Sequence, residues 1–226
     1  MARGQATIGI VLGPLQQRVA RIVAGLPEAR AVALAGGAAL LVHGLSERPT
    51  NDLDFFTTDP TEIAALAAAV EAALQREGLT VEVLRRRDTF VRLSVRDADH
   101  VTLVDLAWDA RLRPPVASDV GPVLDEEELA ADKLLALFSR AEPRDFLDVY
   151  HLSERFGLDR ILQLAQQKDA GLSAPRLAES LGHFDRLDQA DFGLDTDGYR
   201  ALRRWVTSIQ RQLLGRRPPE PPGLGL

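Results

Sequence analysis

The sequence contains no cysteine. The chain therefore forms no disulfide and offers no thiolate ligand, which excludes disulfide-stabilised scaffolds and cysteine-based zinc sites. The absence is also typical of proteins from a reducing compartment, and we expect the protein to be cytoplasmic.

Long hydrophobic runs are missing as well. No apolar segment approaches the roughly 20 residues that a membrane-spanning helix needs. The first residues, MARGQATIGIVLGPL, contain an apolar stretch that is too short and too interrupted for a secretory signal. We therefore expect no membrane partner.

Basic residues are not in excess, because 27 Lys and Arg stand against 33 Asp and Glu, for a net charge of −6. An overall basic coat for nucleic acid is excluded, so any contact with RNA must come from a local patch. Hydrophobic residues are abundant. They make up 46% of the 226 residues, which is sufficient for the core of one large domain or the cores of two small ones.

The first half of the chain alternates helix and strand patterns. The clearest helix, over residues 59–78, has Asp59 as its N-cap, Pro60 at its first position and Gly78 at its end. The other helices and the strands are predicted from the spacing of apolar residues, which has a period of about 3.6 in helices and of 2 in strands. We predict further helices over 12–26 and 36–44, and at least five strands, over 31–35, 52–58, 80–87, 89–96 and 100–108.

The second half is helical throughout. After a proline-rich loop over residues 111–125, we predict helices over 126–140, 143–157, 158–169, 173–184 and 197–214. The fold class is α+β, with an α/β domain over 1–120, a helical domain over 121–214 and a disordered tail over 215–226, where proline and glycine dominate.

A glycine pair precedes two closely spaced carboxylates. Side chains alternate along a strand, so Asp52 and Asp54 share one face with about 6.6 Å between their Cα atoms. Their repulsion is relieved by a hard divalent cation such as Mg²⁺ or Mn²⁺. Gly36 and Gly37 let phosphate oxygens approach backbone N–H groups at the start of a helix. The alternatives are a plain tight turn for the glycines and ordinary turn chemistry for the aspartates.

A third carboxylate, Asp105, lies inside the apolar run LVDLAW. A charge there is costly unless it is paired or bound to metal. Asp105 either completes a two-metal site with the first two aspartates or pairs with an arginine such as Arg92.

Three charged residues stand out in the helical half. Lys133 is four positions from Leu129 and from Leu137, so it lies on a core stripe and needs a partner such as a phosphate or Asp148. The alternative is a lysine that extends past the leucines to solvent. Asp145 and Asp148 share a helix face, and we favour Asp148 as the functional acid because Asp145 in the first turn can serve as a cap.

Arginines cluster on two neighbouring predicted strands. Arg85, Arg87 and Arg92 are candidate RNA contacts, and a second basic stretch runs from Arg203 to Arg217. The alternative for the strand arginines is a solvated sheet face. A local patch on an acidic chain favours contact with one end of an RNA over binding along its length.

Four blocks, in order, carry a family resemblance: GGAALLVHG with RPTNDLDFF, then LVDLAW, LAADKLLALFSR and PRDFLDVYHL. Together they span about residues 32–155, and they resemble the AbiEii group of nucleotidyltransferase toxins, which includes the MenT toxins. The resemblance implies a DNA polymerase-β-like nucleotidyltransferase fold. It also implies that catalysis and metal binding fall to Asp52, Asp54, Asp105, Lys133 and Asp148, and nucleotide binding to Gly36, Gly37, Arg48, Thr50, Lys133 and Asp145.

The activity that the resemblance implies is transfer of a nucleoside monophosphate from an NTP to the 3′ acceptor end of tRNA with Mg²⁺. Such a toxin blocks translation until a cognate antitoxin protein neutralises it. An alternative acceptor is a protein hydroxyl or a small molecule such as an aminoglycoside. A second alternative is a non-catalytic interaction module on the same fold.

Overall fold

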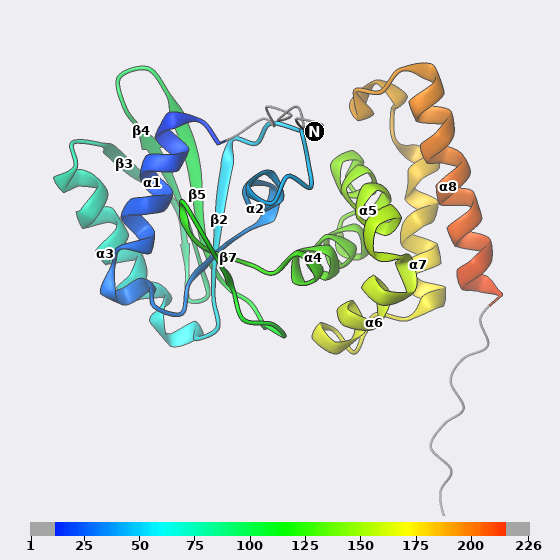
Figure 1. Cartoon of the computed structure of the whole chain (residues 1–226), viewed down its shortest axis with the longest axis horizontal. Coiled ribbons are helices and arrows are strands. Elements are labelled where there is room, and N and C mark those ends of the chain that lie inside the picture. Colours follow the sequence, from blue (N-terminus) through cyan, green and yellow to red (C-terminus); the bar gives the residue numbers. More distant parts are fainter. Residues whose placement is uncertain (1–11, 216–226) are drawn as a thin grey trace, which may run out of the picture. The chain divides into compact units, whose positions relative to one another are not determined.

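The computed structural model describes residues 12–215, which form two compact units. The first unit ends at Leu129 and the second begins at Ala130, within helix α4 (Glu126–Ser139). The predicted α+β class is confirmed by a seven-stranded sheet in the first unit and helices in the second (Figure 1). The predicted domain division at residue 120 remains a prediction, and the predicted tail lies, apart from Gly215, outside the described residues.

The first unit is built on one mixed sheet in the order β3-β4-β5-β2-β1-β7-β6. The strand β2 pairs in parallel with β5 and antiparallel with β1, while β3, β4 and β5 form an antiparallel meander. The strands are β1 (Ala33–Ala35), β2 (Asp52–Thr57), β3 (Thr80–Arg87), β4 (Phe90–Arg96), β5 (Val101–Trp108), β6 (Val116–Ser118) and β7 (Gly121–Val123).

One face of the sheet is apolar and covered by helices. The residues Leu53 of β2, Leu93 of β4 and Val104 of β5 are fully buried on this face. Helices α1 (Pro14–Ala24) and α3 (Ile63–Arg76) pack against each other, and together they contact β3, β4 and β5 (Figure 1). The alternate positions point to the other face, which we call the polar face because it carries aspartates and arginines. The period-2 pattern of the sequence thus separates core from candidate site.

The predicted helix over residues 59–78 forms with its predicted cap. The Asp59 carboxylate accepts hydrogen bonds from the Thr61 hydroxyl at 2.7 Å and from the Thr61 backbone N–H at 2.8 Å, and both lower the pKa of Asp59. A single turn, η2 (Pro60–Glu62), precedes α3. A similar short turn, η1 (Pro27–Ala29), precedes β1, and α2 (Gly36–Val42) follows β1 directly.

The prediction of a loop throughout residues 111–125 is wrong. Two short strands, β6 and β7, form a hairpin there, and β7 pairs in parallel with β1 through Leu34 and Val123. Gly121 turns the hairpin with φ of +112°, and a Cβ at this position would lie 2.4 Å from the Cβ of Ala24. Three-residue strands are too short for hydrophobic periodicity to reveal, which explains the error.

The second unit contains the rest of α4 and the helices α5 (Pro143–Phe156), α6 (Leu158–Lys168), α7 (Ala174–Leu181) and α8 (Thr196–Leu214), with the 3-10 turns η3 (Gly182–Arg186) and η4 (Gln189–Phe192). An aromatic cluster forms part of its core. The Phe184 ring lies 5.3 Å from that of Phe146, 5.1 Å from that of Phe192 and 5.5 Å from that of Tyr199, between ring centroids. The segment between α7 and α8 is therefore fixed by its phenylalanines.

We expect Phe184→Ala to destabilise the second unit by about 3–5 kcal/mol, because it removes a buried ring with three aromatic neighbours. Leu214→Ala, at a side chain that is 67% exposed on α8, is the control and should change the free energy of unfolding by less than about 0.5 kcal/mol. Hydrogen exchange of the amides of α5 and α8 measures the effect on this unit. Equal exchange protection in both variants would contradict the role of the aromatic cluster.

Candidate active site

A row of charged residues crosses the polar face of the sheet. Asp54 of β2 lies directly beside Asp105 of β5, and Asp105 lies directly beside Arg92 of β4. Neighbours in register point to the same face, so the two carboxylates and the guanidinium are adjacent. Asp52 is two residues before Asp54 and shares the face. The structure therefore brings three of the predicted site residues together with Arg92.

The pairing of Arg92 with Asp105 is bidentate. Arg92 donates from Nε to Oδ1 at 2.7 Å and from Nη2 to Oδ2 at 2.6 Å. Asp105 is only 5% exposed, which is the situation in which a carboxylate requires a partner. The hydrogen bond to Asp105 raises the pKa of Arg92 above its ordinary value, and the charges of Asp105, Asp52 and Asp54 act in the same direction against the effect of burial. The guanidinium is thus a fixed cation beside all three aspartates.

Gly36 is required by the position of the Asp54 carboxylate. A Cβ at residue 36 would lie 1.9 Å from Oδ2 of Asp54 and 2.7 Å from its Cγ. The φ of Gly36 is +60°, a conformation that residues with a side chain rarely adopt. The second glycine is different, because a Cβ at Gly37 would meet Thr50 only at 3.4 Å. Gly36 is therefore needed for two reasons: the turn requires a positive φ, and the Asp54 carboxylate lies where a side chain would be.

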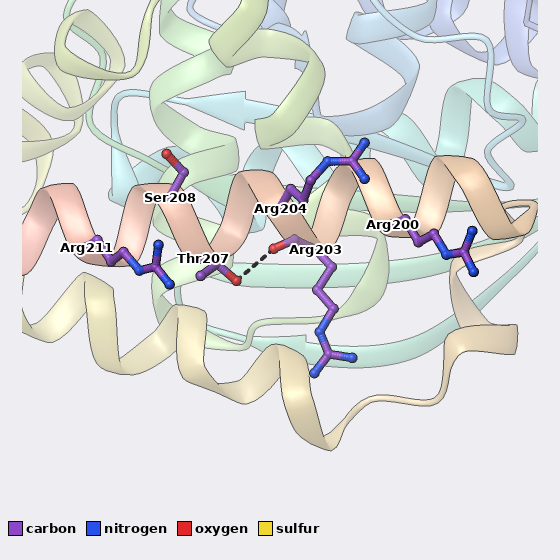
Figure 2. A pocket seen from close by; sticks show the side chains of 6 residues that line it. All are labelled: Arg200, Arg203, Arg204, Thr207, Ser208 and Arg211. Carbon is purple, nitrogen blue, oxygen red and sulfur yellow. Dashed lines mark hydrogen bonds between the residues drawn. The ribbon is translucent and has the colours of Figure 1, made fainter.

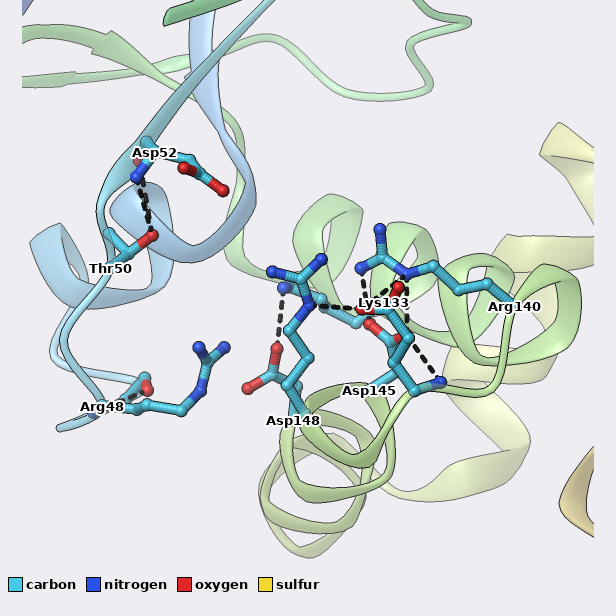
Figure 3. Close-up of polar contacts among 10 residues, drawn as sticks. Arg48, Thr50, Asp52, Lys133, Arg140, Asp145 and Asp148 are labelled. Atoms are coloured by element: carbon cyan, nitrogen blue, oxygen red, sulfur yellow. Dashed lines mark hydrogen bonds and ion pairs between the residues drawn. The ribbon is translucent and has the colours of Figure 1, made fainter. Parts of the chain in front are cut away.

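The loop between α2 and β2 is held beside this turn. The Asp52 backbone N–H donates to Oγ1 of Thr50 at 3.2 Å (Figure 3). Gln16 of α1 donates to the Thr50 carbonyl at 2.8 Å. Arg48, half-buried in the same loop, donates its backbone N–H to Oγ of Ser46 at 3.1 Å. The predicted residues Arg48 and Thr50 thus belong to an ordered segment that leads into β2.

A β-bulge sorts the strand arginines between the two faces. The register of β3 against β4 shifts between Val83 and Arg85, so Arg85 lies opposite Arg92 on the polar face. Arg86 consequently points to the helix-covered face, where it pairs with Glu71 of α3 at 2.5 Å. Arg87 returns to the polar face opposite Phe90. All three candidate RNA contacts, Arg85, Arg87 and Arg92, therefore share the polar face.

In the second unit, Lys133 and Asp148 form a buried ion pair. The Lys133 ammonium lies 2.7 Å from Oδ2 of Asp148, and their side chains are 9% and 4% exposed (Figure 3). Helical spacing indicated that Lys133 faces the core and needs a partner, and Asp148 supplies it. Of the two partners considered from the sequence, the carboxylate is the one that the structure shows.

Asp145 is fully buried at the start of α5. It accepts two hydrogen bonds from Arg140, at 2.8 and 2.7 Å, and one from the Glu142 backbone N–H at 3.2 Å. These contacts join the end of α4 to the start of α5 across Ala141, which has φ of +50°. Its role as a cap, considered from the sequence, is therefore observed, and its role toward a nucleotide remains a prediction.

Two other contacts were not anticipated from the sequence. Glu128, 1% exposed, accepts hydrogen bonds from the backbone N–H groups of Leu112 and Arg113 at 3.0 and 3.1 Å. His43 contacts the Leu124 carbonyl at 2.8 Å. The run of three glutamates at 126–128 reads as a solvated helix start, so only tertiary structure shows that one of them anchors a loop.

The donor set of the polar face fits a hard divalent cation. Asp52, Asp54 and Asp105 offer only carboxylate oxygens, which suit Mg²⁺ or Mn²⁺ rather than softer metals. The bidentate arginine uses two of the roughly four lone-pair positions of the Asp105 carboxylate, so others remain for a second partner. Within residues 12–215, no three His, Cys, Asp or Glu side chains are already arranged around one metal position.

The class of protein is shown by a comparison with protein-family models. A family model described as "Nucleotidyl transferase AbiEii toxin, Type IV TA system" matches residues 21–203. The chain belongs to this AbiEii family, as the four sequence blocks predicted. A comparison with curated proteins finds no match.

Solved structures share the fold. One is JHP933 from Helicobacter pylori, with a TM-score of 0.54 and 20% identity over 90% of this chain and 95% of that chain. Another is MenT4, a nucleotidyltransferase toxin from Mycobacterium tuberculosis H37Rv, with a TM-score of 0.59 and 18% identity over 90% of this chain and 82% of that chain. None of the helices within residues 12–215 is long and apolar enough to cross a bilayer.

The contact between Gly36 and Asp54 predicts an order of stability among three glycine variants. Gly44→Ala imposes a left-handed conformation without any clash and should cost about 1–2 kcal/mol. Gly36→Ala should cost about 1–3 kcal/mol more, because it also displaces the Asp54 carboxylate. Gly37→Ala should stay within about 1 kcal/mol of the wild type. Urea unfolding measures the order, and equal stability of Gly36→Ala and Gly44→Ala would contradict it.

Proposed function

We propose that this chain transfers a nucleoside monophosphate from an NTP to the 3′-terminal hydroxyl of tRNA and thereby blocks translation. The observation that carries the proposal is the acidic row, in which Asp54 lies in register beside Asp105 and against Gly36, with Asp52 on the same face. A purely structural role does not explain three like charges on adjacent strands. Membership of the AbiEii family supports the same reaction class and implies an antitoxin partner.

In this reaction the acceptor hydroxyl oxygen bonds to the α-phosphorus, and the bond from that phosphorus to the bridging oxygen breaks, which releases pyrophosphate. Asp52 and Asp54 would hold Mg²⁺ or Mn²⁺, with Asp105 as a further ligand. When bound, the cation supplies Lewis-acid neutralisation of the phosphate charge. Asp105, oriented by Arg92, also accepts the proton of the acceptor hydroxyl.

The nucleotide phosphates are bound by backbone and side-chain donors. At Gly36 and Gly37 the absence of a Cβ gives phosphate oxygens access to backbone N–H groups. The Thr50 hydroxyl and the Arg48 guanidinium are the candidate donors of the loop that precedes β2. Orientation of the triphosphate by such groups lowers the barrier through proximity rather than through new chemistry.

Lys133 neutralises the charge that develops during transfer, and Asp148 orients its ammonium group. Asp145 supports this arrangement indirectly, because its hydrogen bonds to Arg140 and to the Glu142 backbone fix the start of the helix that carries Asp148.

The tRNA assignment is supported by the arginines of the polar face. Arg85 and Arg87 lie on the same face as the aspartates, and their guanidinium groups suit phosphate oxygens. A small basic area beside an acidic site favours the end of a nucleic acid over binding along its length. Arg92 contributes mainly through Asp105, because its hydrogen bonds are directed there.

Replacing Asp54 by Asn should lower nucleotide transfer at least about 10³-fold, because the substitution removes the charge that holds the metal while it keeps the shape of the side chain. Asp99→Asn, at an exposed turn of the same sheet, is the matched control and should retain wild-type activity. Purified protein is incubated with Mg²⁺, each α-labelled NTP in turn, total tRNA and total cellular protein. Label on tRNA is expected. Label on protein would replace the tRNA assignment, and full activity of Asp54→Asn would contradict the acidic site itself.

The role of the buried pair is tested by neutralising both partners. Lys133→Met combined with Asp148→Asn removes both charges, so neither is left buried and unpaired. We expect the double variant to keep a thermal midpoint within a few degrees of the wild type and to lose transfer by about 10²-fold or more. Transfer at the wild-type rate in a folded double variant would assign the pair to stability alone.

A further inference from the structure

The outer surface of α8 carries a concentration of arginines. Arg200, Arg203, Arg204 and Arg211, together with Thr207 and Ser208, line a pocket of about 520 Å³ in the second unit (Figure 2). All four arginine residues are exposed. This arginine pocket plays no part in the reaction described above.

Helical spacing explains why these side chains gather. The arginines follow residue 200 by 3, 4 and 11 positions, so they lie along one side of the helix. The opposite side is apolar, with Leu202, Val206, Ile209 and Leu213 buried in the unit. At about 1.5 Å per residue, the line from the first arginine to the last is about 16 Å long. The pocket is therefore an elongated basic strip on a well-anchored helix.

The positive charge of the strip is only partly compensated. Arg203 pairs with Asp185 at 2.9 Å, and Arg200 pairs with Asp197 at 3.5 Å. Both partners of each pair are more than half exposed, and ion pairs at exposed positions are weak. Arg211 forms no ion pair with any residue from 12 to 215. Burial raises the pKa of Tyr150, and the positive charge of Arg204 acts on this pKa in the opposite direction. The strip therefore remains available to an anion.

The chemistry of the lining distinguishes between possible partners. Guanidinium groups bind phosphate oxygens in a bidentate manner, and serine and threonine hydroxyls are common further donors to a nucleic-acid backbone. The centre of a protein–protein interface normally contains large apolar or aromatic anchors, and none lines this pocket. The length of the strip suits a chain of phosphates better than a single one.

We propose that the arginine pocket of α8 binds successive phosphates in the backbone of the RNA substrate. This inference rests on the proposed function, because it takes RNA to be the acceptor. It adds a binding surface for the body of that RNA, on an element that carries none of the residues assigned to transfer.

The test is binding of labelled tRNA to the full chain without NTP, measured by fluorescence anisotropy over a series of salt concentrations. Arg204→Ala combined with Arg211→Ala should weaken binding about tenfold, and should reduce the slope of log K against log salt by about 1.4–1.8, since each lost phosphate contact accounts for about 0.7–0.9. The control is Arg30→Ala combined with Arg76→Ala, which removes the same two charges from exposed positions of the first unit. The control should keep the wild-type affinity and slope.

Several outcomes would overturn the proposal. Equal affinity and slope in the pocket variant and the control would show that the pocket does not contact RNA. Unchanged tRNA binding with a loss of binding to inorganic phosphate or pyrophosphate would make the pocket a small-anion site. Unchanged tRNA binding with a loss of antitoxin binding would make it a protein-binding surface.

The assay also separates this inference from the proposed function. Pocket-dependent binding of tRNA without any transfer of label would refute transfer to tRNA and leave the binding surface intact. Transfer to tRNA with pocket-independent binding would refute the surface alone.

Discussion

The arrangement of the first unit depends on holding three carboxylates together on two adjacent strands. Asp52, Asp54 and Asp105 repel one another, and Asp105 is almost fully removed from water. The Arg92 guanidinium offsets this repulsion through two short hydrogen bonds, because a bidentate pair fixes both the charge and its direction. Two other features follow from the same requirement. Residue 36 is a glycine because the Asp54 carboxylate lies against the backbone there, and β4 is in register with β5 so that Arg92 lies beside Asp105.

The arginine also gives the site a stable form before any metal or nucleotide binds. A buried carboxylate without a partner would either take up a proton or destabilise the sheet. With Arg92 in place, Asp105 keeps its orientation. Part of the negative charge of the carboxylates is therefore neutralised before any metal cation binds. The second unit uses the same principle twice, in the pairs of Lys133 with Asp148 and of Arg140 with Asp145. In all three pairs a carboxylate of low exposure is held by a basic residue from the same unit.

Local pattern was sufficient for part of this arrangement. Alternation along a strand predicted that Asp52 and Asp54 share a face, and helical spacing predicted that Lys133 faces the core. The register of β2 against β5 could not be predicted from the sequence, because no local pattern places Asp105 beside Asp54 rather than two residues away. The bulge that separates Arg86 from Arg85 and Arg87 was equally hidden, because a run of three arginines has no internal signal of its turning point. The hairpin of β6 and β7 was missed because its strands pair through only three residues each.

The two basic areas differ in how far their positive charge is compensated. On the polar face, the guanidinium of Arg92 is engaged by Asp105 and lies in the field of two further aspartates, so Arg92 itself has little positive charge left for a phosphate. The arginines of α8 face only exposed and weak carboxylate partners, so their charge is free to act on a polyanion over roughly a Debye length of about 8–10 Å. Chemistry at a phosphate needs carboxylates, whereas affinity for a phosphate backbone needs uncompensated cations. Since these demands conflict within one surface, their separation onto a sheet face and a helix face is the physically consistent solution.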